Sequence, residues 1–169
     1  MYTRPANFCR NAMLALTAAL FLSPIAGASD DDWWSADPIE GLWDARVTIT
    51  DCSSGAPLPV SFDALGLFGR GGSFHNTDAQ NPVMPTMRSS IFGTWKRLHG
   101  RTYRFAFKLY RFDPAGTLIG TQVVRHTLKL ARDGKSYTSA GTSQAFDVNG
   151  NPVAGPPSGC SISTATRFE

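Results

Sequence analysis

Few residues of this chain combine a chemically useful side chain with a position that a fold would enclose. In one strand-like run, Arg125 and Lys129 should face water, which turns Gln122 and His126 to the opposite face. Tyr103 falls on the aromatic face of another run. A histidine and a tyrosine in one enclosed site can transfer protons as acid and base. Buried polar groups without that role must hydrogen-bond one another, water or a ligand.

The same alternation predicts an inner face rich in aromatic side chains. An apolar pocket with a few converging polar groups is the usual form of a small-molecule site. The lining that we expect for such a site comprises Phe74, Asn76, Met84, Met87, Tyr103, Phe105, Phe107, Gln122 and His126. For His126 taken alone, we favour the alternative of a satisfied internal hydrogen-bond cluster.

The sequence carries no established catalytic or metal-binding motif. It has no Gly-x-Ser-x-Gly, no His-Glu-x-x-His and no Gly-rich phosphate loop. The aspartates at 30–32 are better explained as part of a charged arm than as a metal site. We therefore expect no cofactor and no metal, and a binding protein rather than an enzyme. The catalytic candidates are His126 and Tyr103.

Residues 1–28 are typical of a cleaved secretory signal peptide. Arg4 and Arg10 give a positive start, the apolar run Ala12–Leu22 follows, and small residues precede the expected cleavage site before Ser29. A transmembrane anchor is the alternative, but the apolar run is too short to span a bilayer. The mature chain is expected to be secreted or periplasmic.

The charge balance of the mature chain is close to neutral. Of 16 basic residues, Arg4 and Arg10 leave with the signal, so 14 remain against 13 acidic residues. A chain so balanced has no electrostatic footprint for nucleic acid or for an anionic membrane. We expect neither nucleic-acid binding nor stable membrane insertion, and we assign no oligomeric state.

Two of the three cysteines, Cys52 and Cys160, remain after Cys9 leaves with the signal. In an exported domain, two remaining thiols are expected to form a disulfide. A bond across so long a loop stabilises a fold by roughly 4–5 kcal/mol in the chain-entropy model. A metal site is the competing interpretation, but these isolated thiols lack a neighbouring histidine.

Strand-like runs alternate with turn residues from Ile39 onward, and no long helical period occurs. The predicted strands are Gly41–Asp51, Val60–Gly69, Gly72–Thr77, Ile91–Leu98, Arg101–Phe112, Gly120–Ala131, Ser136–Asp147 and Gly159–Phe168. The pattern predicts one all-β domain over residues 39–169, an antiparallel up-and-down meander that closes into an eight-stranded barrel. Residues 29–38 should form a flexible arm. The connection over residues 78–90 is either a flap over a cavity or a segment packed on the wall.

Parity along the first and last strands gives a register. If Cys52 lies opposite Cys160, antiparallel pairing sets Ala45 opposite Arg167, with Trp43 one diagonal step away on the inner face. An arginine over an indole adds ~0.5–2 kcal/mol through cation–π attraction. We therefore expect a first-strand to last-strand disulfide at one end of the barrel and a Trp43–Arg167 pair at the other.

Gly41-Leu42-Trp43 at the start of the first strand and Arg167 on the last strand resemble the signature of the calycin superfamily, as in lipocalins. The resemblance implies an eight-stranded antiparallel barrel that is plugged near the tryptophan, open at the other end and often filled by a small apolar ligand. The chain has no clear counterpart of the lipocalin Thr-Asp-Tyr motif, so a lipocalin-like barrel is expected rather than a typical lipocalin.

The leading functional hypothesis is an exported barrel that binds a small apolar or amphipathic molecule, which enters at the disulfide end. One alternative is a cofactor-free isomerase or cyclase of the allene-oxide-cyclase-like barrel type, with His126 and Tyr103 as acid and base. Another is a filled barrel that acts as an interaction module through its surface loops and the pair Trp33 and Trp34.

Overall fold

The computed structural model describes residues 36–79 and 87–169. Its secondary structure there is antiparallel β-sheet, with a single turn of 3-10 helix at Arg70–Gly72 and no α-helix in these ranges. No helix within these ranges has the length and apolar character needed to cross a membrane. The expected signal peptide, most of the expected arm and Met84 lie outside the described residues.

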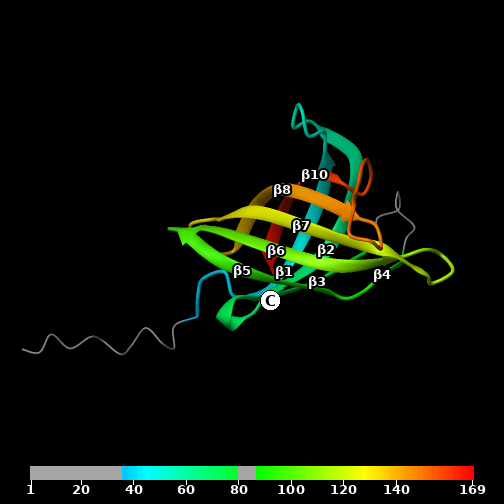
Figure 1. Cartoon of the computed structure of the whole chain (residues 1–169). Helices are drawn as coiled ribbons and strands as arrows, with labels where there is room; N and C mark the ends of the chain where they lie inside the picture. Colours follow the sequence, from blue (N-terminus) through cyan, green and yellow to red (C-terminus); the bar gives the residue numbers. More distant parts are fainter. Residues whose placement is uncertain (1–35, 80–86) are drawn as a thin grey trace, which may run out of the picture. The chain divides into compact units, whose positions relative to one another are not determined.

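Eight antiparallel strands form a closed ring. Each pairs with its neighbour along the chain, and the last strand pairs with both the seventh and the first to close the circle. Their bounds are β1 Gly41–Thr50, β2 Pro57–Phe68, β3 Ser73–Asp78, β5 Ile91–His99, β6 Thr102–Phe112, β7 Leu118–Leu130, β8 Ser136–Phe146 and β10 Gly159–Arg167. In Figure 1, β5, β6 and β7 run across the front of the ring, and β1 and β10 lie behind them.

The eight predicted strands are all present and in the predicted order. The largest difference in boundary is at β2, which begins at Pro57 rather than at Val60. Two short strands were not predicted: β4 (Met87–Arg88) pairs with β6, and β9 (Pro152–Val153) pairs with β8. Part of the connection over residues 78–90 is therefore built into the sheet beside β6.

Side chains alternate between the interior of the ring and solvent as parity predicts. Along β7, every second residue from Gln122 to Leu130 is buried, whereas Arg125 and Lys129 are exposed. Along β6, Tyr103, Phe105 and Leu109 are buried and face inward. The interior is therefore formed by the faces that the sequence assigned to it.

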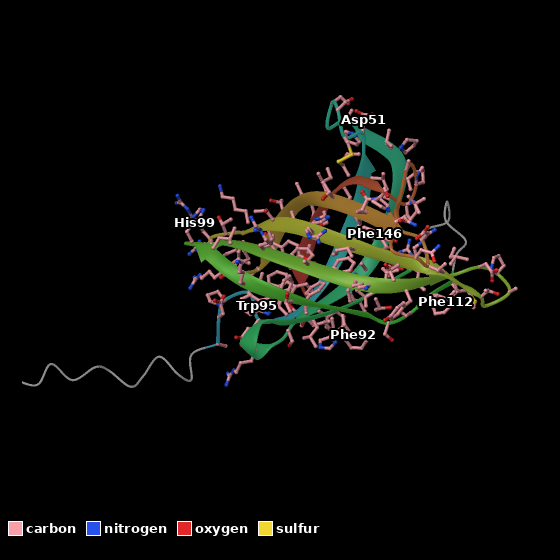
Figure 2. All side chains as sticks on the ribbon, in the orientation of Figure 1. Asp51, Phe92, Trp95, His99, Phe112 and Phe146 are labelled. Carbon is pink, nitrogen blue, oxygen red and sulfur yellow. A yellow bond between two sulfur atoms is a disulfide. The ribbon has the colours of Figure 1, made fainter. Side chains whose placement is uncertain are left out.

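The disulfide between Cys52 and Cys160 forms, but the predicted first-strand to last-strand connection is wrong. β1 ends at Thr50, which lies opposite Cys160, and Cys52 belongs to the turn that follows. Asp51 holds this turn, because its Oδ1 accepts hydrogen bonds from the backbone amides of Ser53 and Ser54 at 2.9 and 2.7 Å. The bond thus links the turn after β1 to β10, close to Asp51 (Figure 2).

The register between β1 and β10 differs by two residues from the expected one. Trp43, rather than Ala45, lies directly opposite Arg167. A shift of two keeps every side chain on its face, so the expected contact still forms: the Arg167 guanidinium lies 4.4 Å from the centre of the Trp43 ring.

We call the end of the ring that contains Trp43 and Arg167 the tryptophan end. Arg167 donates hydrogen bonds to the carbonyl oxygens of Pro38, Glu40 and Gly134, at 2.6, 2.8 and 3.2 Å. The Trp43 indole donates to the Ile39 carbonyl at 2.9 Å. The segment before β1 is thereby tied across this end and closes it.

Candidate functional site

A cavity of about 260 Å³ occupies the interior of the ring near Cys160. We call this the disulfide end. Seven of the eight ring strands and the loop before β10 contribute to its wall. The apolar side chains of the lining are Ala45, Val47, Ile49, Leu58, Val60, Phe62, Ala64, Phe74, Phe105, Phe107, Leu109, Val124, Pro156 and Pro157. The polar ones are Asn76, Asp78, Arg88, Gln122, His126, Tyr137, Ser143, Ser158, Ser161 and Ser163.

The apolar wall is incompletely covered. Val47, Ile49, Val60 and Phe62 face the interior from β1 and β2, yet they are only half-buried. Leu58, at the start of β2, remains 42% exposed. Interior-facing aliphatic and aromatic side chains that stay in contact with solvent indicate that the cavity opens at this end.

Gln122 is the most enclosed amide in this wall, with 6% of its surface exposed. Its Nε2 donates a hydrogen bond of 2.6 Å to Ser143 Oγ, which in turn donates to the Pro157 carbonyl at 2.9 Å. Its Oε1 is fully enclosed but accepts no hydrogen bond from the described residues. A buried acceptor without a donor is costly, which marks this oxygen as a functional candidate.

His126 forms a satisfied hydrogen-bond cluster in the cavity wall. Its Nδ1 lies 2.8 Å from Ser139 Oγ and its Nε2 lies 3.0 Å from Ser161 Oγ. A third serine, Ser163, extends the cluster with an Oγ–Oγ distance of 2.6 Å to Ser139. Burial lowers the pKa of His126 from 6.5 to about 4, so the ring is neutral near neutral pH.

Gly141 makes room for the imidazole of His126. These two residues lie directly opposite each other on β8 and β7. A Cβ atom at position 141 would stand 2.3 Å from His126 Cδ2, which is inside contact distance. The glycine therefore leaves room for the histidine ring beside β8, where the ring nitrogens contact serines of β8 and β10.

The cavity wall also contains a buried ion pair, which was not predicted from the sequence. Asp78 at the end of β3 pairs with Arg88 of β4, and both side chains are about nine-tenths buried. The pair lies in the part of the ring where β6 is hydrogen-bonded to β4 instead of to β5. Because each charge neutralises the other, the wall carries no net charge from this pair.

Tyr137 lies at the deep end of the cavity. Its ring packs against Trp43 and Phe68, with centroids 5.0 and 6.0 Å apart, and burial raises the pKa of its hydroxyl well above the ordinary value. Tyr137 thus separates the cavity from the packed core at the tryptophan end. Strand alternation places Tyr137 and Ser139 on one face of β8, but this strand has no charged residue to show which face is the inner one.

The structure brings six of the nine predicted lining residues to the cavity: Phe74, Asn76, Phe105, Phe107, Gln122 and His126. Met87 does not line it; this residue lies in β4 and is 47% exposed. Met84 lies outside the described residues. The expected aromatic wall is therefore present, whereas no described methionine takes part in it.

Tyr103 faces inward but lies in the core of the tryptophan end rather than at the cavity. It is completely buried, and its hydroxyl donates a hydrogen bond of 2.6 Å to Asp37 Oδ1. Burial and this bond raise the pKa of Tyr103 to about 12. The cavity therefore does not unite Tyr103 with His126 as an acid–base pair.

The described residues contain no cluster of three or more histidine, cysteine, aspartate or glutamate side chains placed to hold a metal ion. What the arrangement can do is enclose an apolar group between aromatic and aliphatic side chains and offer hydrogen bonds to a polar group. No family model, curated protein or solved structure gives a significant match to this chain.

Proposed function

We propose that this protein is an exported, lipocalin-like β-barrel that binds one small apolar or amphipathic molecule in its interior. In this proposal residues 1–28 direct export to the periplasm or the medium and are then removed. The ring of eight strands acts as a rigid container, and the molecule enters at the disulfide end.

The observation that supports this proposal most is the half-open apolar cavity. Binding pockets for small molecules usually measure about 300–1,000 Å³. The cavity of about 260 Å³ lies just below that range and corresponds to roughly nine water molecules at ~30 Å³ each. A single medium-length alkyl chain or a small ring system suits this volume better than a large lipid does.

The plug at the tryptophan end supports the calycin resemblance. Trp43 and Arg167 meet as strand parity predicts, and hydrogen bonds from Arg167 to the carbonyl oxygens of Pro38 and Glu40 fix the segment that closes the ring. A container of this type needs one sealed end and one open end, which is the arrangement we propose.

The two alternatives receive less support. A cofactor-free isomerase or cyclase would need His126 and Tyr103 in one solvent-accessible cavity, but the hydroxyl of Tyr103 is bonded to Asp37 in the core. A filled barrel that acts only through its surface would have no need of an internal apolar cavity.

Mass spectrometry of organic extracts tests the proposal. The protein is purified natively from the exported fraction of its own cells, without detergent, and extracted beside two variants. Val124→Phe narrows the cavity, and Val123→Phe adds the same bulk on the outer face of β7. We expect a small apolar molecule in wild type and in Val123→Phe, and much less of it in folded Val124→Phe. Equal extracts from all three proteins would contradict an interior site.

A further inference from the structure

We infer that the ligand carries a hydrogen-bond donor, such as a hydroxyl group, and delivers it to Gln122 Oε1 at the disulfide end of the cavity. The inference rests on the proposed function and specifies the chemical class of the ligand. It selects neutral amphipathic alcohols over carboxylates and over wholly apolar molecules.

The orientation of the Gln122 amide is fixed by its neighbours. The carbonyl oxygen of Pro157 can only accept, so the single hydroxyl proton of Ser143 must point toward it. Ser143 Oγ therefore has only lone pairs left for Gln122, and the group facing it at 2.6 Å must be the NH₂. Amide orientation is usually inferred from such a network, and here the network permits one choice. Oε1 consequently points away from Ser143.

No described residue donates to Oε1. Gln122 lines the cavity and is 6% exposed, and Oε1 itself is enclosed, so this oxygen has no access to bulk water and a ligand hydroxyl reaches it through a small rotation of the amide. An acceptor in that position gains more from a donor than an exposed one would, because no water bond has to be given up. A ligand hydroxyl supplies that donor.

The position of Gln122 sets the direction in which the ligand lies. Its partner Ser143 pairs across the sheet with Gly159, beside Cys160, and bonds to the loop that contains Pro157. Gln122 therefore belongs to the disulfide end. The aromatic side chains Phe105 and Phe74 lie farther in, where their rings pack 4.9 Å apart. The hydroxyl should lie at the opening and the apolar part against these rings.

A carboxylate is less suited to this site. It has only lone pairs at neutral pH and would set negative oxygen against Gln122 Oε1. Among the described residues of the lining, the one cation, Arg88, is already paired with Asp78. His126 offers no positive charge either, because burial lowers its pKa to about 4.

Three probes of equal chain length test the inference: n-decanol, decyl methyl ether and decanoate. The ether keeps the oxygen acceptor of the alcohol but has no donor, and decanoate replaces the donor with charge. Displacement of the fluorescent probe N-phenylnaphthylamine from the wild-type protein gives their relative affinities. We expect n-decanol to bind roughly tenfold more tightly than the ether and more tightly than decanoate, which corresponds to one well-formed hydrogen bond.

The Gln122→Leu variant should lose this preference and bind alcohol and ether alike. Thr127→Leu, which places the same side chain on the outer face of β7, should keep it. If Gln122→Leu does not fold, Gln122→Met serves the same purpose with a closer shape.

The outcomes separate the two proposals. Binding of all three probes with no advantage for the alcohol, or an advantage that survives in the leucine variant, overturns the donor inference alone. Tightest binding of decanoate overturns it as well. If neither N-phenylnaphthylamine nor any decyl probe binds the wild-type protein, the proposed function fails together with the inference.

Discussion

The two ends of the ring are built from the same alternating strands but differ in what fills them. At the tryptophan end, Trp43, Tyr103 and Leu128 are fully buried, and Arg167 ties the preceding segment across the opening. At the disulfide end, the equivalent interior positions Val47 and Phe107 are half-buried and border a cavity.

The difference shows that strand alternation determines which side chains face inward but not whether the interior is full. At the tryptophan end the added segment before β1 supplies the residues that complete the core. At the disulfide end the chain instead places a covalent bond and a proline-containing loop at the edge. One end is therefore filled and tied closed, and the other contains the cavity in which we propose that a ligand binds.

Truncating one aromatic side chain at each end should give the largest difference between the two ends in the free energy of unfolding. Trp43→Ala removes a fully buried ring and the platform for Arg167, and should lower the free energy of unfolding by about 3–5 kcal/mol. Phe107→Ala enlarges an existing cavity from a half-buried position and should cost only about 1–2 kcal/mol. Equilibrium urea unfolding of both variants measures the difference. Equal losses would contradict the division into two ends.

Loss of the disulfide should have the next largest effect. The bond closes a loop between residues 108 positions apart, and Cys52→Ala with Cys160→Ala should lower the free energy of unfolding by about 2–4 kcal/mol. We also expect hydrogen exchange to increase first in the strand ends near Thr50 and Cys160, while the Trp43 indole stays protected. Loosening that begins at the tryptophan end would show that the bond acts elsewhere.

Protonation of His126 in the cavity wall should lower the stability of the protein at acid pH. Its pKa is about 4 in the folded protein and 6.5 when exposed, so the unfolded chain binds more protons between these values. Stability from this group is therefore complete above pH 6.5 and is lost as the pH falls toward 4. We expect a loss of about 2 kcal/mol between about pH 7 and about pH 5.

Unfolding measured at both pH values in wild type and in His126→Gln tests this expectation. The variant should show a clearly smaller loss. His75→Gln, on the outer face of β3, should retain the wild-type loss. An identical pH dependence in all three proteins would show that His126 is not held neutral by burial.

Ion pairs on the outer face of the ring should contribute least to the free energy of unfolding. Arg46 and Asp63 lie opposite each other on β1 and β2 and form an ion pair of 2.8 Å, but both side chains are more than half exposed. Asp63→Asn should change the free energy of unfolding by less than about 1 kcal/mol, and added salt should reduce the effect further. A larger loss would show that the outer face stabilises the ring more than we infer.

The fold was largely predictable because charged residues mark the outer face of most strands. Arg104 and Lys108 on β6, like Arg125 and Lys129 on β7, leave one choice for the opposite face. The predicted register between β1 and β10 was wrong by two residues, because a shift by an even number leaves every side chain on the same face and parity cannot detect it. Cys52 lies in the turn that Asp51 stabilises, after the end of β1. The alternation of side chains does not show where a strand ends, so this position could not be predicted from it.

The site was predicted only in part. β8 contains no charged residue, so no marker assigned Tyr137, Ser139 and Ser143 to the interior. Asp78 and Arg88 are enclosed only because they neutralise each other, which a sequence pattern does not express. Tyr103 was assigned the correct face but the wrong depth, because alternation contains no information on distance from the closed end.

The most direct test of the central claim is a titration of isotope-labelled protein with n-decanol, followed through the amide and indole signals of its NMR spectrum. We predict saturable shifts at Val47, Phe107 and Gln122 around the cavity, with little change at the Trp43 indole. Shifts confined to the outer face around the exposed Phe92, or no saturable shift at all, would contradict a binding site inside the ring.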